Sequence, residues 1–229
     1  MCKDAKKNNS HGNLQDLNSF HSFVSEMEAK DKILIGAEQL FFKYGIKSVT
    51  MDEIAKNIGM SKKTIYQFFK DKDDLVHHLF KNKIALNKSI TEKIHQEAEN
   101  VVSEIFALMR MMREMLANMN PIIFHDLHKY YPITFKIFED FKNECMLNHI
   151  EKSLLKGQEQ NLVRMDINIK ILSRMRLENL NSGFFGRIFP PDKYTMLEVQ
   201  LEMTEHFLYG VCTLKGHKLI NKFKNVIED

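Results

Sequence analysis

The 229-residue sequence contains no tryptophan, four prolines, nine glycines and three cysteines. Because proline and glycine interrupt helices, their scarcity favours long helices. The cysteines, Cys2, Cys145 and Cys212, are far apart, odd in number and outside any Cys-x-x-Cys spacing. This pattern favours free thiols over a disulfide or a zinc site, and we expect neither a metal nor a cofactor.

Long apolar runs are also missing. No run approaches the ~18 residues typical of a membrane span, and the first ten residues lack the apolar core of a secretory signal. We therefore expect a cytoplasmic protein with no membrane partner. The 44% of hydrophobic residues is enough for a full core.

Positive charge is concentrated in one short part of the chain. Residues 30–83 hold 11 lysines against 7 acidic residues, whereas residues 84–229 hold 19 basic and 19 acidic residues. An excess of lysine is expected of a segment that faces phosphate, although many solvated helix surfaces carry as much.

Helical periodicity begins near Lys30 and stops at Gly45. Thr50-Met-Asp-Glu53 is a capping box, and Ser61 and Asp71 are the N-caps of helices predicted over 62–69 and 72–95. Further helices are predicted at about 98–118, 121–129, 132–156, 167–188, 194–214 and 216–227. Since no segment has a convincing period of two, the predicted fold class is all-α.

The short helices around Gly59 indicate a helix-turn-helix. Such a unit needs a small residue where the helices meet, a turn residue that tolerates positive φ, and an apolar residue that closes the corner. Ala55, Gly59 and Ile65 have these properties at the required spacing. The alternative is a helical hairpin with a chance glycine, which the presence of both caps disfavours.

If Ile65 points inward, helical periodicity exposes one polar face on the second helix of this unit. Lysine can donate to guanine, glutamine can pair with adenine, and a tyrosine hydroxyl can reach a phosphate. A single lysine on a helix is usually a solvated surface charge. Here several hydrogen-bond donors share one face, which favours DNA contact. The exposed set is Lys62, Lys63, Tyr66 and Gln67, with Lys72 in the first turn of the next helix.

The run from Ile33 to Val76 resembles the N-terminal domain of TetR-family regulators, most clearly at Ile54-Ala55, Gly59-Met60-Ser61 and Thr64-Ile65-Tyr66. Residues 206–216 resemble the end of the family's last dimerisation helix. The resemblance implies an N-terminal three-helix helix-turn-helix DNA-binding domain and a C-terminal helical ligand-binding and dimerisation domain. It also implies a homodimer, usually a repressor, that leaves a palindromic operator in double-stranded DNA when a small molecule binds.

The same resemblance assigns roles to individual residues. Thr50, Tyr66 and Lys72 are expected to hold phosphates, and Lys62, Lys63 and Gln67 to read bases. The sequence departs from the family where Lys63 and Phe68 stand, positions at which many members have a small residue and His or Tyr. No arginine precedes Arg110. Because lysine lacks the planar fork of arginine, we expect weak discrimination between bases or readout of DNA shape.

The predicted domains are a disordered extension (1–28, with a short helix over 17–27 as an alternative), a DNA-binding domain (29–76) and a ligand-sensing and dimerisation domain (77–229). Alternating spacings of four and three on the last long helices indicate a dimer interface, although the same stripes could bury within one chain. The expected interface residues are Leu197, Leu201, Leu208, Val211, Ile171 and Met175. A ligand pocket, with ordinary core packing as the alternative, is expected at Phe106, Met109, Met112, Phe124, Tyr131, Phe135 and Phe138.

Other function classes have less support. The sequence has no nucleophile elbow, phosphate loop, zinc-protease helix or dinucleotide-binding glycine pattern, so we expect no enzyme and no catalytic residue. A nucleoid-associated or ligand-independent DNA-binding protein of the same fold stays open, and a C-terminal domain without a cavity would favour it. A helical ligand-binding protein without specific DNA binding is the remaining alternative.

Overall fold

A computed structural model describes residues 14–117, 119–185, 188–190 and 192–225, and helices are the regular elements of this part. The N-terminal helices are α1 (Leu14–Tyr44), α2 (Met51–Ile58), α3 (Lys62–Phe68) and α4 (Lys72–Glu97). The middle ones are α5 (Val101–Leu116), α6 (Ile122–Tyr130), α7 (Pro132–Asp140), the π-helical η1 (Phe141–Met146) and α8 (Leu147–Glu159). The last are α9 (Ile169–Phe185), α10 (Met196–Val211) and α11 (Leu214–Lys224). The all-α prediction is confirmed, and from α2 onward the predicted bounds agree within a few residues.

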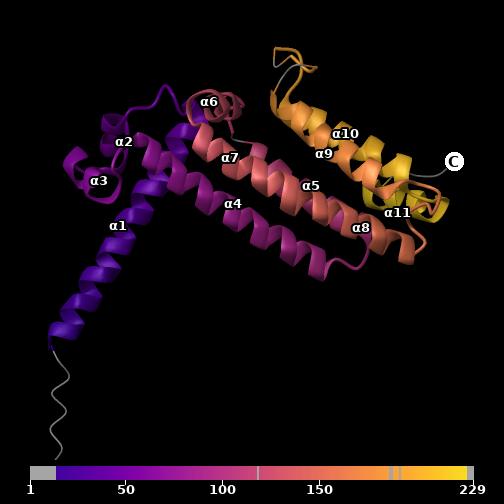
Figure 1. Cartoon of the computed structure of the whole chain (residues 1–229), viewed down its shortest axis with the longest axis horizontal. Helices are drawn as coiled ribbons and strands as arrows, with labels where there is room; N and C mark the ends of the chain where they lie inside the picture. The colour runs from indigo at the N-terminus through magenta and orange to yellow at the C-terminus, as the bar shows by residue number, and fades with distance from the viewer. Residues whose placement is uncertain (1–13, 118, 186–187, 191, 226–229) are drawn as a thin grey trace, which may run out of the picture.

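The helices form an elongated assembly with α2 and α3 at one end (Figure 1). The long α4 runs from that end and packs against α5 and α7. Helices α5 and α8 lie between α4 and the α9–α10 pair, and α11 packs on α5. No helix in the described part of the chain is long and apolar enough to cross a membrane.

The first helix is longer than predicted. Periodicity placed its start near Lys30, whereas α1 begins at Leu14 and passes without a break through the predicted domain boundary at residue 28. Helix α1 thus includes residues 14–28 of the segment for which disorder was predicted, and residues 1–13 lie outside the described part. The amino-terminal part of α1 projects away from the other helices (Figure 1).

Two large hydrophobic cores hold the chain together. The first joins α1, α2 and α3 to the start of α4, and it also takes Ile123, Leu127 and Phe135 from α6 and α7. The second joins α5, α8, α10 and α11. Because α6 and α7 share the first core, the predicted end of the helix-turn-helix domain at residue 76 is not a boundary in the packing.

The predicted helix 132–156 is interrupted by the wider π-helical turn of η1. A π-helical turn changes the direction in which its side chains point and is frequent at functional sites. Here the turn places Phe141, Lys142 and Met146 on the wall of an internal cavity. An isolated antiparallel bridge between Val163 and Cys212 fixes the loop after α8 to the junction of α10 and α11.

Candidate nucleic-acid interface and internal cavity

The turn between α2 and α3 has the geometry that the sequence predicts. Gly59 adopts φ 66° and ψ 34°, a left-handed conformation that glycine favours, and the Met60 amide donates to the Ala55 carbonyl at 3.0 Å. Ala55 and Ile65 are buried where the two helices meet. A close approach that the sequence analysis missed occurs at Gly36 of α1, where a Cβ atom would lie 2.1 Å from the Ile58 side chain.

The caps of these helices are formed as predicted. The Thr50 side chain accepts from the Glu53 amide at 3.2 Å, and the Glu53 carboxylate accepts from the Thr50 amide at 2.7 Å. The hydrogen bonds that the Thr50 amide and the Thr50 hydroxyl donate to the Glu53 carboxylate hold the pKa of Glu53 below its usual value. The Ser61 hydroxyl accepts from the Thr64 amide at 3.0 Å and so sets the start of α3.

Helix α3 buries Ile65 and exposes the residues that the sequence analysis selected as base readers. Lys62, Lys63 and Gln67 are exposed, and Tyr66 is 45% exposed beside them. Lys62 donates to an Asp52 carboxylate oxygen at 2.8 Å, which raises the pKa of its ammonium. A base contact by Lys62 would therefore have to share or replace the Asp52 contact.

The two other expected phosphate contacts are already engaged. The Thr50 hydroxyl donates to the Glu53 carboxylate at 2.9 Å, so its proton is directed away from an approaching phosphate. The Lys72 ammonium is partly buried; it lies 5.9 Å from the centroid of the Phe41 ring and donates to the Lys47 carbonyl at 3.3 Å. Burial lowers the pKa of Lys72. Within the free chain, Lys72 contacts the loop between α1 and α2.

The second candidate site is an apolar cavity of about 280 Å³ between α4, α5, η1, α8, α9 and α10, with contributions from α1, α6 and α7. Its walls are mainly methionine, phenylalanine, leucine and isoleucine, as expected for a pocket that adapts to an apolar ligand. Four of the predicted pocket residues line it: Met109, Met112, Phe124 and Phe138.

Three predicted pocket residues do not line the cavity. Tyr131 and Phe135 belong to the first core, and burial raises the pKa of Tyr131 to about 12. Phe106 instead packs against the second core and stacks on Phe223 of α11, with 4.9 Å between the ring centroids. Aromatic content alone could not separate these residues from the cavity walls, because core and pocket walls select the same residue types.

Polar cavity residues are the feature that the sequence analysis missed. Glu104, Lys142, His149 and Arg176 line the cavity. A signal was present for two of them. Glu104 lies on the apolar face of α5, one turn from Val101 and Leu108, and Arg176 lies one turn from Leu172 and Leu180. Arg110 and Arg113 of α5 are exposed and do not line the cavity.

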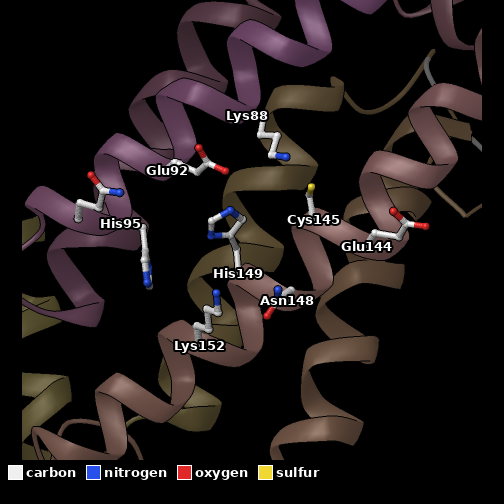
Figure 2. Close-up of a pocket in the computed structure, with 9 residues that line it drawn as sticks. Lys88, Glu92, His95, Glu144, Cys145, Asn148, His149 and Lys152 are labelled. Carbon is white, nitrogen blue, oxygen red and sulfur yellow. The ribbon is translucent and has the colours of Figure 1, made fainter.

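A shallower hollow of about 350 Å³ lies outside this cavity between α4, η1 and α8 (Figure 2). Its side chains are mostly charged or polar, and His149 lines both spaces. The His149 and His95 rings meet edge to face at 5.6 Å between centroids. Burial and the neighbouring His95 lower the pKa of His149. Within the described part of the chain, no group of three or more His, Cys, Asp or Glu side chains comes together as in a metal site.

Comparison with known proteins identifies the family. Residues 33–79 match the model of the bacterial regulatory proteins of the tetR family. The uncharacterized HTH-type transcriptional regulator YhgD of Bacillus subtilis is 28% identical over 118 residues. These residues are 50% of this chain and 53% of YhgD, so the match spans about half the length of that relative. Residues 33–79 are therefore a DNA-binding domain of the TetR-family type.

Solved structures show the same fold over most of this TetR-family chain. A putative transcriptional regulator from Saccharomonospora viridis in complex with choline has a TM-score of 0.67 at 15% identity and covers 82% of this chain and 99% of its own. The regulator FadR from Bacillus subtilis in complex with stearoyl-CoA has a TM-score of 0.57 at 19% identity. The match covers 79% of this chain and 98% of FadR. These two likenesses show the fold, whereas the match over residues 33–79 and the curated relatives support a transcriptional regulator of the TetR type with a DNA-binding helix-turn-helix.

The single chain itself buries part of the dimer interface that was predicted for this TetR-type chain. Leu208 and Val211 are 1% and 2% exposed within the single chain, because α10 packs its stripe against α5 inside the second core. Alternating spacing shows that a face is buried and does not show what buries it. Leu197 and Leu201 are partly buried, whereas Ile171 and Met175 of α9 are 63% and 44% exposed.

Helix α6 joins the cavity of the TetR-type fold to its DNA-binding helices. The Asn120 amide, just before α6, donates to the Phe42 carbonyl of α1 at 2.7 Å. The buried Asp126 carboxylate accepts from the Lys47 amide at 2.8 Å, and the Tyr130 hydroxyl lies 2.8 Å from the Lys47 ammonium. Phe124 of the same helix lines the cavity, so a displacement of that wall would be transmitted to the loop between α1 and α2.

Proposed function

We propose that this TetR-type regulator is a homodimeric repressor that binds a palindromic operator through α3 and leaves it when a small molecule fills the internal cavity. Lys62, Lys63 and Gln67 read base edges in the major groove, and Tyr66 contacts a phosphate. Thr50 and Lys72 contact the backbone after giving up their intramolecular hydrogen bonds. The observation that carries the ligand response is the cavity itself, since a fully packed C-terminal domain would have favoured a ligand-independent protein.

The coupling between the two sites runs through helices that touch both. Phe42 of α1 and Lys83 of α4 line the cavity, and the Lys83 ammonium lies 2.5 Å from the Glu38 carboxylate of α1. A ligand that moves α4 or α6 therefore also moves α1, and with it α3. Two half-sites lie about one DNA turn apart, so a small change in the separation of the two α3 helices weakens binding.

The dimer surface that we propose is the outer face of α9. Ile171 and Met175 are spaced by four residues and stay exposed in the single chain, so a second copy would cover them. Leu197 and Leu201 contribute the part of their surface that the chain leaves uncovered. The distances between the two copies would then set the separation of the two DNA-binding ends.

Footprinting on the DNA that flanks the chain's own gene tests this proposal. A symmetric repressor protects two related half-sites whose centres are about 10 base pairs apart, or a multiple of that. Sedimentation of the same complex gives an even number of chains per operator. Protection of a single unrepeated site, or an operator affinity that a saturating ligand leaves unchanged, would contradict the dimeric or the ligand-released part of the proposal.

A further inference from the structure

The cavity combines apolar walls with two charged side chains that differ in how well they are satisfied. Glu104 lies on α5 and Arg176 on α9. Each has a buried polar atom without a hydrogen-bond partner among the described residues, Oε2 of Glu104 and Nη1 of Arg176. Buried polar groups in proteins are usually paired, so an unpaired atom that lines a cavity points to a missing partner.

The Glu104 carboxylate finds most of its hydrogen-bond partners within the chain. Its other oxygen, Oε1, accepts from the Ser153 hydroxyl and lies 3.0 Å from Nδ1 of His95. The acidic end of the cavity is therefore supplied with two partners by the chain itself.

Arg176 has neither a counter-charge nor a full set of acceptors. Its Nη2 donates to the Thr204 hydroxyl at 2.6 Å, and its guanidinium lies 5.5 Å from the centroid of the Phe207 ring, which holds it in place. No ion pair of Arg176 occurs within the described residues, and burial lowers its pKa to about 10. Asn181, whose Oδ1 also lacks a described partner, lines the same cavity.

We propose that the cavity binds a monocarboxylate with an apolar tail, whose carboxylate pairs with Arg176 and whose tail lies among the methionines of α5. Arginine presents two parallel N–H donors that match the two oxygens of a carboxylate. At about 30 Å³ for each water-sized group, 280 Å³ holds on the order of ten non-hydrogen atoms, the size of octanoate. This inference rests on the proposal that the cavity is the effector site.

A cationic ligand is the competing chemistry, because Glu104 could face an ammonium group. It fits the structure less well. Glu104 already has the Ser153 hydroxyl and the His95 ring as partners, whereas Arg176 would stay uncompensated with a cation in the same cavity. An uncompensated buried charge is costly, so the anion is favoured.

Calorimetry of the full-length protein without DNA tests the inference with octanoate, 1-octanol and octyltrimethylammonium. We expect octanoate to bind one per chain and at least about 10-fold more tightly than 1-octanol, since hydrogen bonds to charged groups are the stronger ones. Arg176→Met should weaken octanoate about 10- to 100-fold and leave 1-octanol within a few fold. Arg110→Met, the same change at an exposed arginine outside the cavity, is the matched control and should change neither.

Equal binding of octanoate and 1-octanol, tighter binding of octyltrimethylammonium, or no binding of all three would overturn the inference. Arg176→Lys, which keeps the charge but not the fork, should fall between the wild type and Arg176→Met, so the result does not depend on one variant. Operator release is measured separately. Octanoate that binds through Arg176 without releasing DNA would contradict the proposed function and leave the inference standing.

Discussion

The two ends of the molecule differ in how far their polar side chains are hydrogen-bonded within the chain. Around α2 and α3, Thr50, Glu53 and Ser61 exchange hydrogen bonds within a few residues. Around the cavity, buried atoms of Glu104, His149, Arg176 and Asn181 have no partner among the described residues. The DNA-binding end is thus complete in the free chain and offers an exposed face, whereas the cavity has polar groups that a ligand can satisfy.

The largest change in the free energy of unfolding is expected in the first core, at the DNA-binding end. Ile33 is fully buried in the first core and Ile35, two residues along the same helix, is 57% exposed. We expect Ile33→Ala to lower the free energy of unfolding by about 2–5 kcal/mol and Ile35→Ala to change it by less than about 0.5 kcal/mol. Chemical denaturation measures both. Equal effects of the two changes would mean that α1 is not packed as described.

A substitution in the cavity should instead raise the free energy of unfolding. Replacing Arg176 by Met removes a buried, uncompensated charge and keeps the apolar stem, so the ligand-free protein should become more stable by about 1–3 kcal/mol. Denaturation of the protein purified without ligand measures the change. A loss of stability of similar size would show that Arg176 is satisfied in the free chain and would remove the contrast between the two ends.

A smaller effect is expected at the α2 cap. Thr50→Ala removes the acceptor for the Glu53 amide and should cost about 1 kcal/mol, whereas Thr50→Ser keeps it and should cost less. Since the folded-state pKa of Glu53 is lowered, its stabilising contribution is present above its ordinary pKa of 4.5 and is lost as the pH falls below it. Denaturation of Thr50→Ala at low pH should therefore differ less from the wild type than at neutral pH.

The smallest effect concerns His149, at the wall shared by the cavity and the outer hollow. Its pKa is lowered from 6.5, so the unfolded chain takes up a proton first and the folded protein loses stability as the pH falls below about 6.5. His95, Glu92, Lys152 and Glu104 act on the same ring. The melting temperature should fall less between pH 7.5 and 5.5 in His149→Gln than in the wild type. The exposed His125→Gln serves as the control, and an unchanged slope in His149→Gln would contradict the assignment.

The same contrast explains what could be predicted from the sequence. Gly59, Thr50 and Ser61 act within one turn of their own position, so local spacing was enough to place α2 and α3. The cavity depends on side chains from helices far apart in the chain. Arg176 and Met112 meet there only after folding, and no local rule distinguishes Met112 from the core residue Phe135 or Leu201 from the buried Leu208.

The central claim, that α3 reads a specific DNA sequence, is tested most directly by affinity for the DNA that flanks the chain's own gene, at about 0.15 M salt with non-specific competitor. The wild type should bind tightly, and Lys62→Ala/Tyr66→Ala should lose on the order of 100-fold. Lys193→Ala/Tyr194→Ala is the matched control, because Tyr66 and Tyr194 are 45% and 46% exposed, and it should bind like the wild type. Binding that ignores sequence, or that survives the change in α3, would contradict the claim.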